Sequence, residues 1–169
     1  MRRVLPWILV LVLAVGWRPV RDALQDDDPG GSAAQPARVA RVVDGDTIVV
    51  ARGGGEERVR YIGVDTPETV KPRTPVQCFG RKASAFNHRL LDGRSVRLVA
   101  DAEQRDRYGR LLAYVYRADD GLFVNAELVR HGYATTLTIP PNVRYAERFR
   151  ALAAEARRAG RGLWSACGR

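Results

Sequence analysis

Short runs of β-branched residues, separated by glycine-containing turns, restrict the fold of this chain more than any other feature. Two such runs flank Asp44-Gly45 and predict a β-hairpin that begins at Arg38. Three more strands are expected, at residues 58–64, 95–99 and 111–116. A helix over residues 79–91 separates the third strand from the fourth. Five short strands with one helix in that place predict a closed Greek-key barrel of the OB type, in the α+β class.

Two further helices are expected after the fifth strand. One covers residues 125–131, and the other covers residues 142–159 with Asn142 as its N-cap. The barrel domain with its three helices is therefore expected to span residues 38–165, and residues 166–169 form a short C-terminal tail.

The segment before this domain indicates export. Arg2 and Arg3 precede an apolar run over residues 4–17, and this run is short for a helix that must cross about 30 Å of hydrocarbon. Residues 1–17 are therefore interpreted as a signal peptide, with an uncleaved membrane anchor as the alternative. Residues 18–37 contain DDDPGGSAAQP, too polar to bury much apolar surface, and are expected to be a flexible linker. The domain is thus expected to be secreted, periplasmic or at the cell surface.

The net charge and the few His and Cys residues limit the kinds of partner and of catalysis to be expected. Lys and Arg total 28 against 19 acidic residues, giving a net charge of +9. This excess favours a polyanionic partner, nucleic acid before an anionic membrane surface. The chain has only two His and two Cys, which argues against zinc sites built on these residues and against His-driven acid–base catalysis. Catalysis would therefore depend on carboxylates, arginines and a hard metal ion.

Three short polar clusters are candidates for such chemistry. Their sequences are DGDT at residues 44–47, RYIGVDTPE at residues 60–68 and DRYGR at residues 106–110. Taken singly, each has a structural explanation: a hairpin turn, a helix start capped by Thr66, and an exposed turn.

Taken together, the clusters predict phosphodiester hydrolysis. Asp46, Asp65 and Glu68 lie at or beside predicted strand ends, where the loops of one barrel face can converge, and hard oxygen ligands suit Ca²⁺ or Mg²⁺. Arg60 and Arg110 present forked cations that can hold a phosphate bidentately. A metal and guanidinium groups that stabilise charge on phosphorus, with a base that aligns water, are what this reaction requires.

The segments VVDGDT, RYIGVDTPE and DRYGRLLAYVY, in this order and spacing, closely resemble the staphylococcal nuclease (thermonuclease) family. The resemblance runs from about Val39 to Trp164 and includes CFGRKASAF, VNAELVRHGYA and RGLW. It implies an OB-fold barrel with three helices and a calcium-dependent endonuclease that leaves 3′-phosphate ends. The expected substrates are DNA and RNA, single-stranded or locally open, and the protein is expected to be a monomer.

The resemblance also implies a metal site and a catalytic carboxylate. Ca²⁺ would be bound by the carboxylates of Asp46 and Asp65 and by the backbone carbonyl of Thr66. Glu68 matches the carboxylate that positions or deprotonates the attacking water.

Substrate-binding residues follow from the same match. Arg60 and Arg110 correspond to the arginines that clamp the scissile phosphate, with Arg110 nearest the leaving 5′-oxygen, and Tyr108 corresponds to a tyrosine near the substrate phosphate. Lys71 and Arg73 lie in the loop at residues 69–76, where they either follow the phosphate backbone or are merely solvated charges.

The segment before the last helix departs from the family. The type member has two tyrosines there, whereas this chain reads TTLTIPPN, with Leu137 and Thr138 at the corresponding places. Stacking of a base on an aromatic ring contributes about 1–3 kcal/mol, so mononucleotide affinity is expected to be weaker. His88 and His131 lie on predicted helices outside the three clusters and are expected to be structural.

The two cysteines flank the helical part of the domain. Cys78 precedes the first helix and Cys167 follows the last. In an exported protein two such cysteines can pair and tie the C-terminal tail to the barrel, with two free thiols as the alternative.

Two other classes of function compete with a working nuclease. One is a catalytically silent OB-fold module that only binds nucleic acid, and the other is a basic adhesion protein anchored at the surface. The set of metal-binding and arginine side chains favours catalysis, since a silent module has no need to retain all five: Asp46, Arg60, Asp65, Glu68 and Arg110.

Overall fold

The computed structural model describes residues 35–69 and 75–168. The expected signal peptide or anchor at residues 1–17, most of the linker, and Lys71 and Arg73 lie outside the described residues. Within the two described ranges, no helix combines the length and the apolar character needed to span a bilayer.

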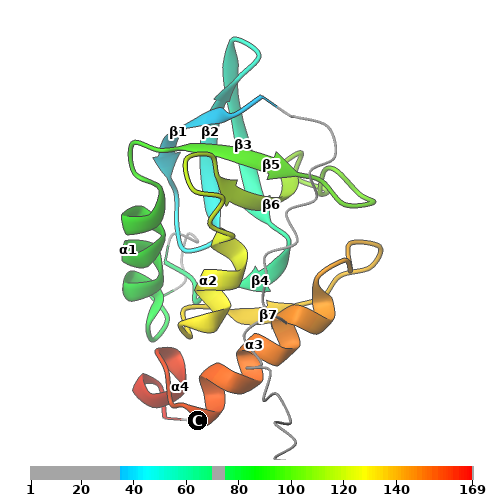
Figure 1. Cartoon of the computed structure of the whole chain (residues 1–169). Coiled ribbons are helices and arrows are strands. Elements are labelled where there is room, and N and C mark those ends of the chain that lie inside the picture. Colours follow the sequence, from blue (N-terminus) through cyan, green and yellow to red (C-terminus); the bar gives the residue numbers. More distant parts are fainter. Residues whose placement is uncertain (1–34, 70–74, 169) are drawn as a thin grey trace, which may run out of the picture.

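Five strands close into a barrel in the order β1-β2-β3-β6-β5 (Figure 1). Their bounds are Ala37–Val42 for β1, Thr47–Arg52 for β2, Gly55–Tyr61 for β3, Ser95–Val99 for β5 and Leu111–Arg117 for β6. All neighbours pair antiparallel except β3 and β6, which run parallel, and pairing of β1 with β5 closes the barrel. The prediction of a five-stranded barrel of the OB type is confirmed.

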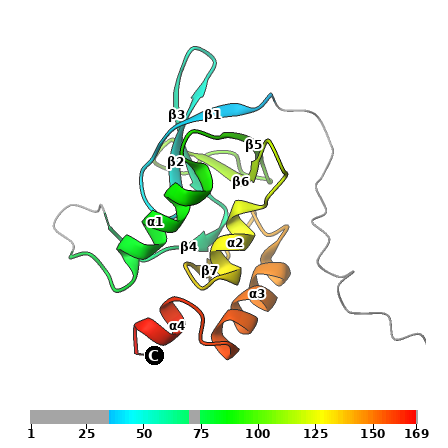
Figure 2. The ribbon, with the colours of Figure 1, turned by 60° about the vertical axis from the view of Figure 1, so that its left-hand side comes forward.

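A second layer of structure covers one end and one side of the barrel (Figures 1 and 2). It contains a two-stranded sheet of β4 (Gly63–Asp65) with β7 (Thr135–Leu137). The helices are α1 (Gly80–Leu91), α2 (Val124–Arg130), α3 (Ala146–Arg158) and the four-residue α4 (Leu163–Ala166). α2 packs on β6 and on α3, and α3 packs on the β4–β7 sheet.

The strand β6 holds these layers together because it is buried on both faces. Four consecutive residues, 113–116, are buried, as expected when one face of a strand points into the barrel and the other is covered by helices. On the helical side, Tyr116 stacks on Phe123 with ring centroids 4.4 Å apart, and Tyr114 meets Tyr145 edge-on at 4.6 Å. These aromatic contacts fix the segment that begins α3 against the barrel.

Asn142 does not cap the third helix, contrary to the sequence-based expectation. α3 begins at Ala146 with Tyr145 at the N-cap, while the Asn142 side chain pairs with the backbone of Glu103. The N–H of Glu103 donates to Asn142 Oδ1 at 2.7 Å, and Asn142 Nδ2 donates to the Glu103 carbonyl at 2.9 Å. A buried amide whose oxygen and nitrogen are both hydrogen-bonded in this way braces two loops that are distant in sequence.

The strand expected at residues 58–64 is interrupted at Ile62, so that β3 ends at Tyr61 and β4 begins at Gly63. Gly63 has φ of 80°, and a Cβ atom there would lie 2.4 Å from the Phe149 ring. Only glycine allows both the left-handed backbone and the close approach of α3. The chain therefore turns out of the barrel at this point and carries Asp65 to the barrel end.

We expect Gly63→Ala to lower the free energy of unfolding by about 2–5 kcal/mol, from left-handed backbone strain and overpacking against Phe149. Urea unfolding measures this difference. Gly53→Ala is the matched control, since Gly53 also has positive φ (60°) but has nothing within 4 Å of an added Cβ. Equal losses in the two variants would show that the contact with Phe149 has no energetic weight.

Candidate active site

The candidate site lies where β2 begins, β3 ends and β6 begins. Asp46 immediately precedes β2, Arg60 is the penultimate residue of β3, and Arg110 immediately precedes β6. In the parallel pairing of β3 with β6, Arg60 lies beside Leu112. Since side chains alternate along a strand, Arg110 projects on the same side as Leu112 and therefore as Arg60.

The Arg60 guanidinium joins two carboxylates, one from the β1–β2 turn and one from β4. Its NH1 lies 3.0 Å from Asp46 Oδ1, and its NH2 lies 2.8 Å from Asp65 Oδ1. NH1 also donates to the Val64 carbonyl at 3.0 Å. The Arg60 and Asp46 side chains are only 14% and 8% exposed, so water screens this pair weakly. The pair with Asp65 is screened more strongly, because the Asp65 side chain is 53% exposed.

Asp46 is tied equally closely to Thr66. Its Oδ2 accepts hydrogen bonds from the Thr66 backbone N–H at 2.7 Å and from the Thr66 hydroxyl at 2.8 Å. The approach depends on Gly45, where a Cβ atom would lie 2.6–2.8 Å from the Thr66 side chain. The β1–β2 turn thus brings Asp46, Asp65 and the Thr66 backbone to one place.

Negative charge is concentrated at this end of the barrel. Burial, followed by repulsion from Asp46, raises the pKa of Asp44 to about 6. Burial also raises the pKa of Asp65, against the opposing effect of Arg60. Sequence reasoning treated Asp44 only as a turn residue, although its position two residues before Asp46 was the available signal that it would share the site.

Glu68 follows the same segment and adds to this charge, since it contributes to the raised pKa of Asp65. The Glu68 backbone N–H donates to Gln77 Oε1 at 2.9 Å, and Glu68 Oε1 accepts the Thr69 N–H at 2.8 Å. Hydrogen bonds therefore hold both the main chain and the carboxylate of Glu68, close enough to Asp65 to affect its pKa.

Arg110 is oriented by Asp106, a residue to which sequence reasoning gave no role. Arg110 Nε donates to Asp106 Oδ2 at 2.7 Å, and Asp106 Oδ1 accepts the backbone N–H groups of Arg110 and Tyr108 at 3.0 and 2.9 Å. Burial opposes ionisation of Asp106, but these hydrogen bonds outweigh it and lower the pKa of the carboxyl. Arg110 is thereby fixed at the edge of the site.

Tyr108 forms an exposed platform next to Arg110. The residue is 68% exposed, with the Arg110 guanidinium 5.5 Å and the Arg107 guanidinium 4.8 Å from the ring centroid. Arg107 NH2 also donates to the Tyr108 hydroxyl at 2.7 Å. The turn before β6 thus presents two cations and an aromatic face to solvent.

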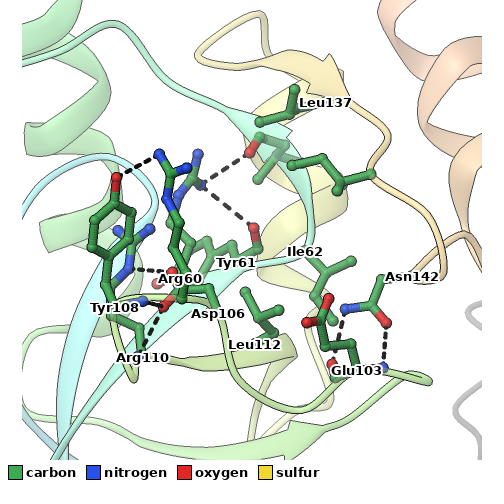
Figure 3. A pocket seen from close by; sticks show the side chains of 14 residues that line it. Arg60, Tyr61, Ile62, Glu103, Asp106, Tyr108, Arg110, Leu112, Leu137 and Asn142 are labelled. Atoms are coloured by element: carbon green, nitrogen blue, oxygen red, sulfur yellow. Dashed lines mark hydrogen bonds and ion pairs between the residues drawn. The ribbon is translucent and has the colours of Figure 1, made fainter.

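A pocket of about 490 Å³ is lined by the arginines and Tyr108, whereas the acidic residues Asp46, Asp65 and Glu68 do not line it (Figure 3). One end is cationic and holds Arg60, Arg107, Arg110 and Tyr108, while the other is largely aliphatic and holds Ile62, Leu112, Leu137 and Ile139. Leu137 lines the pocket, whereas Ile139 rather than Thr138 is the second residue of this segment that does so. An anionic group and an adjoining flat apolar group, as in a nucleotide, match this division of the pocket.

The donor set at the barrel end suits a hard divalent cation. The carboxylates of Asp46 and Asp65 lie against one guanidinium, next to Thr66, whose backbone carbonyl is the third expected ligand. Burial is the main cause of the raised pKa values of Asp44 and Asp65, with a smaller contribution from repulsion by Asp46, and a bound cation would favour the ionised carboxylates. Among the described residues, no group of three or more His, Cys, Asp or Glu side chains is arranged to hold a metal.

The remaining residues singled out from the sequence lie outside the pocket that Arg60 and Arg110 line. Cys78 and Cys167 form a disulfide with Cα atoms 5.9 Å apart. His88 and His131 each pair with a carboxylate one helical turn away, Asp92 and Glu127, and neither lines the pocket.

An OB-type barrel that carries paired acidic residues and arginines at one end, beside an arginine-lined pocket, is the arrangement expected of a nuclease. Residues 58–166 match the family model described as "Staphylococcal nuclease homologue". The chain is 38% identical to the thermonuclease of Staphylococcus hyicus over 156 residues, covering 92% of this chain and 91% of that protein. It is 38% identical to the thermonuclease of Staphylococcus intermedius over 169 residues, covering 97% and 99%. With endonuclease YncB of Bacillus subtilis it shares 42% identity over 130 residues, covering 76% and 61%. The chain therefore belongs to the staphylococcal nuclease family.

Proposed function

We propose that this chain is a Ca²⁺-dependent endonuclease that hydrolyses phosphodiester bonds of DNA and RNA and leaves 3′-phosphate ends. The observation that carries the proposal is the arrangement of Arg60 and Arg110 in one pocket, with Asp46 and Asp65 both paired to Arg60 and with Glu68 close enough to Asp65 to raise its pKa. The thermonuclease names of two relatives support the same activity.

In this proposal the carboxylates of Asp46 and Asp65 and the Thr66 carbonyl would hold the Ca²⁺ ion. When bound, the cation would supply positive charge to the phosphate and polarise water. The chain's own contribution is to gather two negative charges that repel each other, and Arg60 keeps them together by bridging both.

The remaining side chains act on the phosphate and on water. Arg60 and Arg110 bind the non-bridging phosphate oxygens and stabilise the charge that grows on them as phosphorus becomes pentacoordinate. Glu68 orients a water molecule and accepts its proton as the water oxygen forms a bond to phosphorus. The P–O5′ bond breaks, and the leaving oxygen takes its proton from solvent because a guanidinium keeps its protons at physiological pH.

Divalent-cation removal tests this proposal. We expect cleavage of plasmid DNA and of RNA to require Ca²⁺ and to stop when a chelator is added in excess, because the two carboxylates cannot organise the phosphate without a counter-charge. The measurement is the initial rate with Ca²⁺, Mg²⁺ and chelator in parallel, with phosphatase treatment of end-labelled products to locate the phosphate.

Undiminished cleavage in chelator would contradict the metal dependence. Tight DNA binding with no cleavage in any cation would indicate the alternative function, a nucleic-acid-binding module. Asp65→Asn provides a second check, since it should raise the Ca²⁺ concentration needed for half-maximal activity while the barrel keeps its fold.

We further propose that the chain is exported through residues 1–17 and acts as a monomer. The apolar run after Arg2 and Arg3 supports the first statement. Mass measurement of protein from the culture medium and from the membrane fraction would distinguish a cleaved signal peptide from an anchor, and sedimentation would report the oligomeric state.

A further inference from the structure

Gln77 clamps the main chain on both sides of Glu68. Its side-chain Oε1 accepts the Glu68 N–H at 2.9 Å, and its own backbone N–H donates to the Glu68 carbonyl at 3.0 Å. We propose that Gln77, held in place by the Cys78–Cys167 disulfide, is a positioning residue for Glu68, so that turnover depends on this disulfide being intact. The inference rests on the proposed catalytic role of Glu68.

The clamp is packed directly against the start of α1. The Gly80 N–H donates to the Gln77 carbonyl at 3.0 Å. A Cβ atom on Gly80 would lie 3.0 Å from the carbonyl oxygens of Glu68 and Pro67 and 2.8 Å from Thr69 Cγ2. The first turn of the helix therefore packs so closely on the Glu68 segment that residue 80 has no room for a side chain.

The residue between the disulfide and Gly80 is held in an unfavourable conformation. Phe79 has φ of 68° and ψ of −6°, which is rare for a bulky residue and persists only where the surroundings enforce it. The centroid of the Phe79 ring lies 5.3 Å from that of the Tyr133 ring, and Lys82 Nζ lies 5.1 Å from the Phe79 centroid. On the other side of Phe79, the chain is fixed by Cys78.

The disulfide connects the residues before α1 to the segment that follows α4. Cys167 follows α4, which lies beside the start of α1 (Figure 2). The Cys167 N–H donates to Leu163 at 3.1 Å, and the Leu163 N–H donates to Gly132 at 2.8 Å, so α4 is anchored to the loop after α2. Gln77, both cysteines, Asp65 and Thr66 line a second pocket, of about 410 Å³, which places the disulfide next to the proposed metal ligands.

Covalent support is needed because Gln77 is exposed. Water competes for its two hydrogen bonds to Glu68, and exposed hydrogen bonds of this kind are individually weak. Opening the disulfide would let Phe79 leave its left-handed conformation and let Gln77 move away from Glu68. Asp46, Arg60 and Thr66 are linked to one another through the barrel and do not depend on this clamp.

The expected effect is therefore on turnover rather than on substrate binding. A misplacement of a reacting group by about 1 Å can reduce the rate about 100-fold. We expect reduction of the full chain by a dithiol to lower kcat about 10- to 100-fold with little change in KM. In the reaction the dithiol passes two electrons and two protons to the Cys78–Cys167 bond, giving two thiols and a cyclic disulfide, and reoxidation should restore kcat.

Variants separate positioning from general stability. Gln77→Leu removes the acceptor for the Glu68 N–H and should lower kcat as reduction does, whereas Gln77→Glu keeps an acceptor oxygen and should retain most of kcat. Cys78→Ala with Cys167→Ala should reproduce the reduced state. Val96→Ala is the control, because Val96 is fully buried in β5 and its loss destabilises the barrel without touching the Glu68 segment.

Steady-state kinetics on these proteins, with circular dichroism at the assay temperature, decides the matter. If the disulfide acts through the hydrogen bonds of Gln77 to Glu68, reducing the Gln77→Leu variant should lower its kcat little further, since the substitution has already removed that support. Full kcat in reduced protein, or in Gln77→Leu, would overturn the proposal if Glu68→Gln is inactive. Full activity in Glu68→Gln would instead overturn the proposed role of Glu68 itself.

Discussion

Replacing Arg110 with alanine is expected to reduce kcat by about 100- to 1,000-fold, the loss typical of removing one preorganised charge donor from a transition state. Arg110 lies at the cationic end of the pocket, and Asp106 fixes its Nε at 2.7 Å while the terminal nitrogens remain for substrate. Single-turnover cleavage of a short labelled oligonucleotide measures the chemical step directly. KM should change less than kcat, because the developing charge on phosphate is what the guanidinium stabilises.

Two further variants make this measurement specific to Arg110. Arg110→Lys keeps the charge but loses the planar fork, so its kcat should lie between those of wild type and alanine variant. Arg94→Ala removes the same charge at a solvent-exposed pair with Asp119, outside the pocket, and should leave kcat unchanged. A loss in Arg94→Ala equal to that in Arg110→Ala would show that overall charge, not position, matters.

The barrel was predictable because its determinants are local. β-Branched runs and glycine-containing turns specify strands and hairpins over a few residues, and the helix before β5 limits the topology that can close. The same logic indicated that the acidic residues and arginines would converge, since each lies at a strand end. Asp46, Arg60 and Asp65 do meet, at 2.8–3.0 Å.

The parts that sequence reasoning missed depend on tertiary contacts. β7 has three residues and is a strand only because it pairs with β4, and α4 has four residues anchored through Gly132. Asn142 is of a residue type that often caps helices, but here its side-chain amide instead forms hydrogen bonds with both the N–H and the carbonyl of Glu103. Such short elements carry too little local preference to be recognised from sequence alone.

The supporting residues of the site were missed for a related reason. Asp44, Asp106 and Gln77 act by holding other groups, and each is of a type that is usually a turn or surface residue. Their roles appear only from the partners they contact: Asp46, Arg110 and Glu68. A pattern of residue types can therefore indicate a reaction, while the geometry that supports it has to be seen.

Glu68→Gln is the second change with a large expected effect, a loss of about 100- to 10,000-fold in kcat, the range that a positioned acid or base contributes. Glutamine has the size of glutamate, and its carbonyl oxygen can still accept the Thr69 N–H that Glu68 Oε1 accepts at 2.8 Å. The Gln77 clamp acts on the main chain and is unaffected by the substitution. Folding should therefore survive while the capacity to take a proton from water is lost.

The contrast between Glu68→Gln and Glu68→Asp shows which property of the carboxylate matters. Aspartate keeps the charge but shortens the side chain by one methylene, so partial activity is expected if proton acceptance dominates, and near-complete loss if position dominates. Ca²⁺ titration of both variants provides the control: the cation should activate at similar concentrations, since Asp46, Asp65 and Thr66 are unchanged. Wild-type kcat in Glu68→Gln would exclude Glu68 as the general base, and the half-buried Asp44, whose pKa burial and Asp46 raise to about 6, would then be the carboxylate to test.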